Sequence, residues 1–215
     1  MLNKINNKES EVKIWIFFKK EFKNFLTETD NNYASQLGGD RLKEYLLSRS
    51  YIRYALSILL EDDPFNIPLI APPGKPPLLK NDGYISISHC RDAFLLAWSI
   101  EKIGIDIERF DRKIVSKNFA TKFFNNVELE ELNTSQFIEN TLLKRWVVKE
   151  SLIKWNLSSI FKNSKDWIWR YGEQKAFNYK EDLKVKVYQT RFEKWEIGIA
   201  SNRIGNSFPI ICRDL

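Results

Sequence analysis

GIDIERF, at residues 104–110, alternates apolar and charged residues and therefore predicts a β-strand with two different faces. On a strand, residues i and i+2 share a face, so Ile105 and Ile107 lie on one side and Asp106 and Glu108 on the other. Two carboxylates this close repel each other unless positive charge lies between them. Two interpretations stay open: a solvated sheet surface, which is the commoner case, or ligands for a cation such as Mg²⁺.

Further strand and helix patterns flank this stretch on both sides. Strands are expected at 12–18, 84–90, 93–100, 175–180, 183–192 and 194–201. Helices are expected at 41–60, where Asp40 would form the cap, and at 116–124, 126–133 and 140–158. The order of these elements predicts an α+β fold of two similar halves, residues 1–103 and 104–215, that meet at the GIDIERF strand.

The composition is that of a globular protein whose positive charge favours an anionic partner. Apolar residues make up 43% of the 215 residues, and 34 Lys and Arg against 28 Asp and Glu give a net charge of +6. This charge alone does not distinguish a nucleotide, a nucleic acid, an anionic lipid or an acidic protein. Two cysteines are too few for a disulfide scaffold or a zinc cluster. Because no segment has the ~20 apolar residues of a membrane span or the pattern of a signal peptide, a cytoplasmic location is expected.

A second charged constellation lies in WVVKESLIK, residues 146–154. At 100° per residue, one helix arc of about 140° carries Lys149, Glu150 and Lys154 together with Trp146 and Ile153. Glu150 and Lys154 have the spacing of an ordinary surface ion pair, worth ~0.3–0.5 kcal/mol. The aromatic and aliphatic side chains on the same arc place these charges near a buried edge, where a charge needs a partner or a function.

Three further features suit an anion, although each also has an ordinary structural interpretation. The single histidine, His89, ends a predicted strand, and Lys75 lies in the proline-framed loop PPGKPP at 72–77. Arg49 and Arg53 are spaced i,i+4 on the first predicted helix and could grip a phosphate from one face. The glycine motifs of P-loop and Rossmann nucleotide sites are missing from the sequence.

The order and joint presence of these motifs resemble one enzyme family. GKPP (74–77), ISISHC (85–90), GIDIE (104–108), FFNNVE (123–128) and WVVKESLIK (146–154) are similar to the motifs of the 4′-phosphopantetheinyl transferases. The pairing of a G-[IV]-D-[IV]-E strand with a W-x-x-K-E-[SA]-x-x-K helix is the most specific part of the resemblance. The chain length resembles the larger, surfactin-synthetase-activating (Sfp-like) type. This resemblance implies a monomer whose two α+β subdomains form a pseudo-dimer with the active site in the cleft between them.

The resemblance also implies a reaction. The 4′-phosphopantetheine arm of coenzyme A would move to a serine hydroxyl of an apo acyl or peptidyl carrier protein, with release of 3′,5′-ADP. Mg²⁺, with Mn²⁺ as an alternative, would accompany coenzyme A. The partner would be an acidic carrier protein of fatty-acid, polyketide or nonribosomal peptide synthesis, which suits a basic enzyme. Neither a nucleic acid nor a membrane is expected as a partner.

Residue roles follow from the resemblance, position by position. The implied metal ligands are Asp106, Glu108 and Glu150, with Glu128 a further acid near the site. The implied catalytic residues are Glu150, as the candidate base, and Lys154, which would stabilise the leaving phosphate. The implied coenzyme A contacts are Arg49, Arg53, Lys75, Ser88, His89, Asp106, Lys149 and Lys154.

Two positions depart from the family pattern. Cys90 replaces the serine that commonly follows the histidine, and Glu44 occupies a position where many relatives have an arginine. Lys43 or Arg41 could take over the role of that arginine toward the 3′-phosphate of coenzyme A.

Three other functions compete with this interpretation. A metal-dependent nuclease would require an E-x-K strand, but Arg109 and Phe110 follow Glu108. A non-catalytic module that binds RNA or an acidic protein would explain the charge but not the ordered motifs. An inactive member of the family would retain the fold, but every acid of the implied metal site is present.

Overall fold

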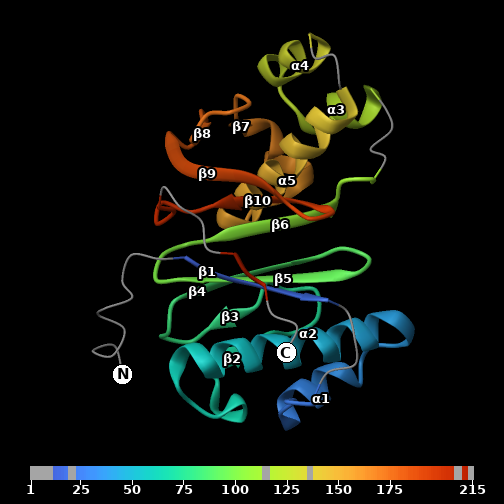
Figure 1. The fold of residues 1–215 in the computed structure, drawn as a ribbon, viewed down its shortest axis with the longest axis vertical. Coiled ribbons are helices and arrows are strands. Elements are labelled where there is room, and N and C mark those ends of the chain that lie inside the picture. The colour runs from blue at the N-terminus through green and yellow to red at the C-terminus, as the bar shows by residue number, and fades with distance from the viewer. Residues whose placement is uncertain (1–11, 19–22, 113–116, 135–137, 206–209, 213–215) are drawn as a thin grey trace.

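The computed structural model describes residues 12–18, 23–112, 117–134, 138–205 and 210–212. Helices and strands both contribute heavily, which confirms the predicted α+β class. Figure 1 shows the elements up to β5 in one half of the molecule and β6 to β10 in the other.

The first sheet contains the N-terminal strands and has the order β11-β1-β5-β4. Its strands are β1 Lys13–Phe18, β4 Tyr84–His89, β5 Ala93–Ser99 and β11 Ile210–Cys212. The other elements of this half are α1 Glu28–Ala34, α2 Gly39–Leu60, the 3-10 helix η2 Pro64–Asn66, and the short strands β2 Leu69–Ile70 and β3 Leu78–Leu79. Helix α2 has its N-cap at Gly38, so Asp40 is not the predicted cap but lies in the first turn.

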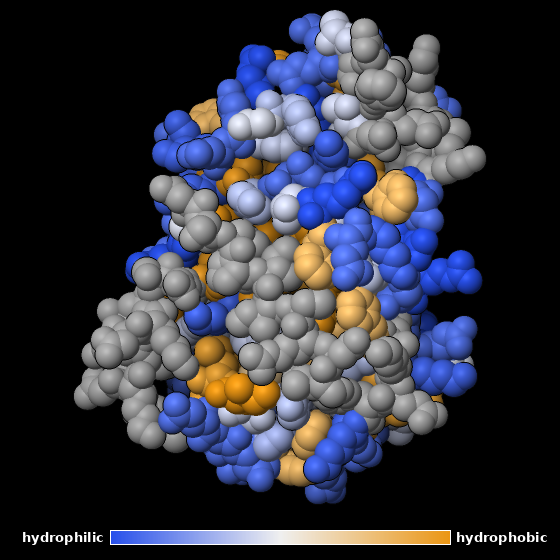
Figure 2. Space-filling view, viewed as in Figure 1, coloured by the Kyte–Doolittle hydropathy of each residue, from blue (hydrophilic) through white to orange (hydrophobic). Residues whose placement is uncertain are grey.

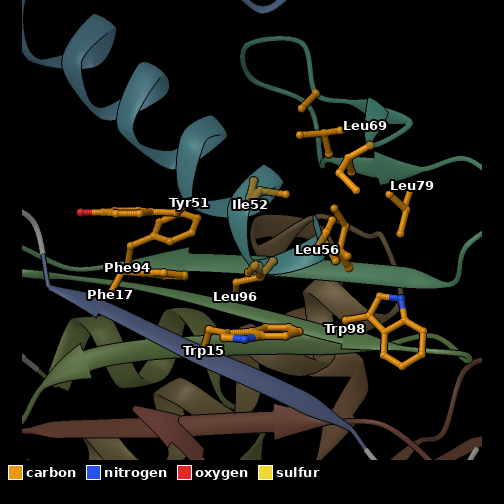
Figure 3. Close-up of a cluster of buried hydrophobic side chains, with 14 residues drawn as sticks. Trp15, Phe17, Tyr51, Ile52, Leu56, Leu69, Leu79, Phe94, Leu96 and Trp98 are labelled. Atoms are coloured by element: carbon orange, nitrogen blue, oxygen red, sulfur yellow. The ribbon is translucent and has the colours of Figure 1, made fainter. Parts of the chain in front are cut away.

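Helix α2 packs on the outer face of this sheet through an apolar cluster (Figure 3). Ile52 and Leu56 of α2 and Leu96 of β5 are fully buried there. The ring of Tyr51 stacks on Phe17 of β1 with 4.4 Å between centroids. The four-residue spacing of Ile52 and Leu56 places both side chains on the same side of the helix, so the predicted amphipathic face is the one that meets the sheet.

The second sheet has the order β6-β10-β9-β8-β7. Its strands are β6 Gly104–Arg109, β7 Trp167–Ile168, β8 Lys175–Asn178, β9 Leu183–Phe192 and β10 Trp195–Ala200. Its helices are α3 Lys117–Phe123, α4 Asn126–Asn133, α5 Ile138–Trp155, α6 Ile160–Asn163 and the 3-10 helix η3 Ser164–Asp166.

The two sheets pack against each other through aliphatic side chains. Ile105 and Ile107 of β6 and Ile197 of β10 share a buried cluster with Ile14 and Ile16 of β1. The order of layers is therefore α2, first sheet, second sheet, α5. Residues on alternate positions of β6, including Asp106, face α5 instead. The boundary between 103 and 104 stays a prediction: β6 begins at Gly104, but β11 pairs in parallel with β1 and joins the first sheet.

Within the described ranges, every helix is too short or too polar to cross a membrane. On the face shown in Figure 2, hydrophilic residues predominate, and hydrophobic ones form small groups between them.

Helix α5 approaches the second sheet so closely that glycine is required. A Cβ atom added to Gly198 of β10 would lie 2.2 Å from the carbonyl oxygen of Val147. Because both contacting groups belong to backbones, neither can move aside cheaply. We expect Gly198→Ala to lower the free energy of unfolding by about 3 kcal/mol in a denaturant titration. Gly38→Ala is the control, since a Cβ there meets nothing within 4 Å; equal losses in both variants would contradict the close packing.

Candidate functional site

Three elements bring polar side chains together where the two sheets meet. The hydroxyl of Ser88 on β4 donates to Oδ1 of Asp106 on β6 at 2.7 Å. The ammonium group of Lys154 on α5 donates to the same oxygen at 2.8 Å and to Ser88 Oγ at 2.9 Å. Strand β4 is the edge strand of the first sheet and lies beside β6. The backbone amide of Ile105 on β6 donates to Ser86 Oγ on β4 at 3.1 Å. Residues from both halves therefore form one polar cluster.

The other carboxylate oxygen of Asp106 lacks a partner. Asp106 is 4% exposed, and its Oδ2 is buried without a hydrogen bond among the described residues. Burial first, and then the negative charge of Asp106, together raise the pKa of nearby Glu150 to about 7, against the opposing effect of Lys154 and Arg112. A buried unpartnered oxygen beside a carboxyl group that resists ionisation indicates a place suited to a cation.

Glu108, the third predicted metal ligand, has a different partner. Its Oε1 pairs with the guanidinium of Arg112, four residues along the chain. Among the residues that the structure describes, no three His, Cys, Asp or Glu side chains are grouped closely enough to hold a metal. A cation at this place would have Asp106 and Glu150 as its carboxylates. Their donor set fits Mg²⁺, which commonly takes one or two carboxylates and completes its shell with water and substrate phosphates.

A basic pocket of about 230 Å³ lies between α2, the proline-rich loop and the end of β4. It brings together Arg49, Lys75 and His89, three of the predicted phosphate contacts, and adds Arg41. Glu44 also lines it, and its Oε2 lies 3.5 Å from His89 Nε2. Apart from that carboxylate, the charged side chains of the pocket are cationic, so it is suited to an anionic ligand.

Arg49 is the most enclosed cation of this pocket. It is 5% exposed, its Nε donates to the Ala71 carbonyl at 3.2 Å, and its guanidinium lies 4.2 Å from the Tyr45 ring centroid. Burial lowers its pKa from the usual value. None of the described carboxylates forms an ion pair with it. A buried guanidinium that faces a pocket without an acidic partner favours an anionic ligand.

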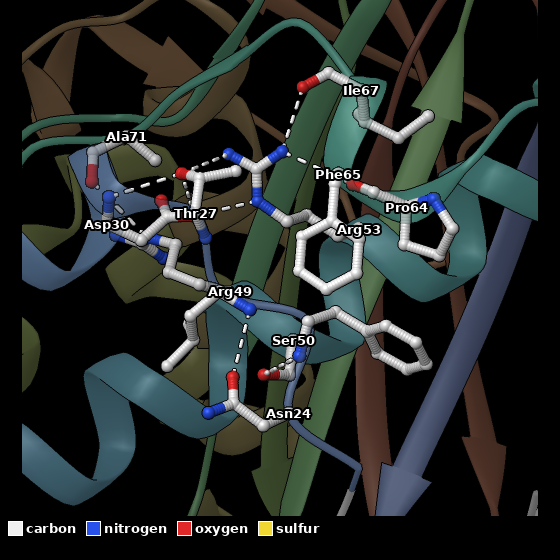
Figure 4. A network of polar contacts seen from close by, with 12 residues as sticks. Asn24, Thr27, Asp30, Arg49, Ser50, Arg53, Pro64, Phe65, Ile67 and Ala71 are labelled. Atoms are coloured by element: carbon white, nitrogen blue, oxygen red, sulfur yellow. Dashed lines mark hydrogen bonds and ion pairs between the residues drawn. The ribbon is translucent and has the colours of Figure 1, made fainter.

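Arg53 lies elsewhere, in a buried network shown in Figure 4. Its Nε donates to Asp30 Oδ2 at 2.7 Å, and its Nη1 donates to the Ile67 carbonyl at 2.9 Å. Asp30 belongs to α1, where it forms a capping box with Thr27, and no helix was expected at this segment. Although Arg49 and Arg53 are spaced i,i+4, they have different surroundings. Arg53 pairs with a carboxylate of α1, whereas Arg49 lines the basic pocket.

Lys149 and Glu128 pair with each other, away from the Asp106 cluster. The Lys149 ammonium donates to both Glu128 carboxylate oxygens, at 2.8 and 2.6 Å, and to the Trp167 carbonyl at 2.7 Å. Each residue is 1% exposed. Burial lowers the pKa of Lys149, while the charge of Glu128 opposes this change.

The comparison with protein families points to the half that contains β6 and α5. Residues 102–200 match the model of the 4′-phosphopantetheinyl transferase superfamily. The matched region includes Asp106, Glu150 and Lys154, whereas the basic pocket and Ser88 lie outside it. The matched region thus contains the carboxylates of the polar cluster, whereas Ser88 and the residues that line the basic pocket belong to the N-terminal half.

Among known structures, one distant likeness is to a synthase of carrier proteins. The crystal structure of Thermotoga maritima holo-[acyl-carrier-protein] synthase is 18% identical, with a TM-score of 0.36. The similarity covers 46% of this chain and 61% of that synthase. No curated protein matches the chain.

Sequence reasoning missed several residues of the site. Tyr45 supports the Arg49 guanidinium from four residues earlier on α2, a spacing that is visible in the sequence. Ser86, which accepts the Ile105 amide, shares its strand face with Ser88 and could have been found from strand alternation. Only the i,i+4 spacing of Glu108 and Arg112 in the sequence indicated that these two side chains could form an ion pair.

Proposed function

We propose that this chain is a 4′-phosphopantetheinyl transferase of the larger, surfactin-synthetase-activating type. It transfers the phosphopantetheine arm of coenzyme A to a serine hydroxyl of an apo acyl or peptidyl carrier protein and releases 3′,5′-ADP. The observation that carries the proposal is the buried, unpartnered Oδ2 of Asp106 beside Glu150, in a cluster that Lys154 and Ser88 complete. Such a site can neutralise a pyrophosphate and accept a proton.

Coenzyme A would occupy the basic pocket with its phosphates directed toward Asp106. Arg49, Lys75 and His89 would bind phosphate oxygens, since all three line the pocket. Lys154 would contact the phosphates next to the bond that breaks, and Ser88 would contact them by turning its hydroxyl hydrogen away from Asp106. Arg53 and Lys149 are left out of this proposal because partners within the protein occupy their donors.

Asp106 and Glu150 would hold Mg²⁺ or Mn²⁺, with Glu108 as a third ligand if it leaves Arg112. When bound, the cation supplies positive charge that offsets the pyrophosphate. Glu150 would accept the proton of the carrier serine, directly or through a water, as the second carboxylate of the cluster. The serine oxygen forms the new bond to phosphorus, the old phosphoanhydride bond breaks, and Lys154 stabilises the charge left on 3′,5′-ADP.

The same proposal includes the biological setting. The net charge of +6 favours an acidic carrier protein, drawn from fatty-acid, polyketide or peptide synthesis. The enzyme would act as a cytoplasmic monomer, with residues 1–103 and 104–215 as its two subdomains and its active site between them.

Mass spectrometry of apo carrier proteins tests the proposed function. Incubation with coenzyme A and Mg²⁺ should raise the carrier mass by one phosphopantetheine group, and carriers of the three pathways should be compared side by side. A carrier whose acceptor serine is replaced by alanine is the control. If folded protein leaves all three carriers unmodified, the proposed function is wrong.

Arg49→Met should weaken coenzyme A binding specifically. Loss of one charge-assisted hydrogen bond in a buried pocket should raise the dissociation constant for 3′,5′-ADP about 10- to 100-fold. Isothermal titration calorimetry measures the change, with the exposed Lys80→Met as the control for a lost surface charge. Equal affinities in Arg49→Met and wild type would remove Arg49 from the site.

A further inference from the structure

The buried side chains of Glu128 and Lys149 form their hydrogen bonds with each other and with backbone groups of the protein. The ammonium group of Lys149 has three hydrogens, and the structure gives it three acceptors: two carboxylate oxygens and the Trp167 carbonyl. Glu128 also accepts from the Trp169 amide at 3.2 Å and from the Asn125 amide at 3.2 Å. With 1% exposure each, neither side chain can meet a ligand that arrives from solvent.

This pair connects three segments that lie far apart in the sequence. Glu128 stands in the first turn of α4, where it forms a capping box with Asn125. The Trp167 and Trp169 backbone groups belong to β7 and the residues that follow it. Lys149 belongs to α5, and its ammonium group lies 5.2 Å from the Phe124 ring centroid. The pair therefore attaches α5 to α4 and β7 at a single point in the helix.

That point is immediately beside Glu150. Successive helix residues differ by 100° in direction, so Lys149 can anchor one side of α5 while Glu150 faces Asp106 on another. Any shift or rotation of α5 would change the distance between the two carboxylates. The Lys149 anchor restrains this movement because an unpaired buried charge is strongly unfavourable.

We propose that Glu128 and Lys149 are positioning residues that hold α5 so that Glu150 faces Asp106, and that neither touches coenzyme A. The kinetic part of this inference rests on the proposed transferase function, whereas its binding and stability parts do not. It assigns to both residues a role different from the phosphate contact and the site acid that sequence resemblance implied.

Three variants test the role. Lys149→Met leaves Glu128 as an unpaired buried charge, and Glu128→Gln leaves Lys149 unpaired. The double variant Glu128→Gln/Lys149→Met removes both charges, and its glutamine can still accept from the Trp169 amide and donate to the Trp167 carbonyl. We expect both single variants to unfold at clearly lower temperature than wild type and the double variant to recover most of the loss. Equal unfolding temperatures in all four proteins would overturn the inference.

Ligand binding separates positioning from contact with coenzyme A. Calorimetry with 3′,5′-ADP, without metal, should give affinities within about twofold of wild type for all three variants, at a temperature where each is folded. A loss of tenfold or more in Lys149→Met that persists in the double variant would show that Lys149 contacts the nucleotide, and would overturn the inference. Because calorimetry with 3′,5′-ADP does not depend on phosphopantetheine transfer, its result tests the inference even if no carrier protein is modified.

The Mg²⁺ concentration that each variant requires reports whether Glu150 is correctly placed beside Asp106. Lys149→Met should need about tenfold more Mg²⁺ than wild type, both for half-maximal thermal stabilisation and for half-maximal transfer, while its KM for coenzyme A stays within twofold. The double variant should return toward wild type. Asp30→Asn is the control, because it breaks a buried pair with Arg53 in the other half. If Asp30→Asn raises the Mg²⁺ requirement equally, the effect reflects general instability and the inference fails.

Discussion

Asp106→Asn is expected to lower the rate of phosphopantetheine transfer on the order of 10³-fold while the protein stays folded. The substitution removes the charge that would face the cation and the pyrophosphate, but keeps the shape of the side chain. Its amide oxygen can still accept from Lys154 and Ser88, which now bond to Asp106 Oδ1. Loss of this charge ends its repulsion of Glu150 but also its ion pair with Lys154, and these two effects on stability oppose each other.

Steady-state transfer rates and thermal unfolding of the Asp106→Asn protein should be measured together. Asp111→Asn serves as the matched control, because Asp111 is exposed and pairs with Arg109 outside the cluster. The control should keep nearly full activity. A folded Asp106→Asn protein with wild-type turnover at saturating Mg²⁺ would refute the assignment of the site.

Glu150→Gln is expected to change activity and stability in opposite directions. Transfer should fall on the order of 10³-fold, because the variant loses both the proposed proton acceptor and a cation ligand. The metal-free protein should become more stable at pH 8 by about 3 kcal/mol, since a carboxyl group whose pKa rises from 4.5 to about 7 on folding resists ionisation there.

The sign of this effect follows from proton binding. Below about pH 4.5 the carboxyl group is protonated in both the folded and the unfolded chain, so it makes no difference there. Between about pH 4.5 and 7 the unfolded chain loses the proton first, and the stability of the wild type falls as the pH rises. Above pH 7 the difference between wild type and Glu150→Gln should be constant.

Denaturant titrations of both proteins from pH 4 to 8 measure this difference. Added Mg²⁺ should stabilise the wild type at pH 8 more than Glu150→Gln, because only the wild type has a second carboxylate for the cation. Parallel stability curves for the two proteins across the whole range would contradict the raised pKa. Glu173→Gln, on the exposed turn before β8, controls for the loss of one surface acid.

Local patterns were sufficient where an element depends on its own residues. The alternation of Ile105, Asp106 and Ile107 predicted β6 and its two faces, and the structure places the isoleucines between the sheets and Asp106 toward α5. The proline-rich segment after α2, residues 64–79, suits an extended or looped chain, and it contains only the three-residue 3-10 helix η2 and the two-residue strands β2 and β3. The short helix α1 was missed because seven mostly polar residues give no apolar period, although Thr27 and Asp30 have capping-box spacing.

The sequence by itself determined which residues share a face. It indicated that Asp106 and Glu108 lie side by side on a strand, and that Lys149, Glu150 and Lys154 lie on one arc of a helix. Only the tertiary structure decided which of these charges meet. Lys154 reaches Asp106, Lys149 turns to Glu128, and Arg53 is held by Asp30 while Arg49 lines the pocket. The physical reason is that periodicity fixes the direction of a side chain from its own backbone, whereas its partner comes from a segment whose position depends on long-range packing.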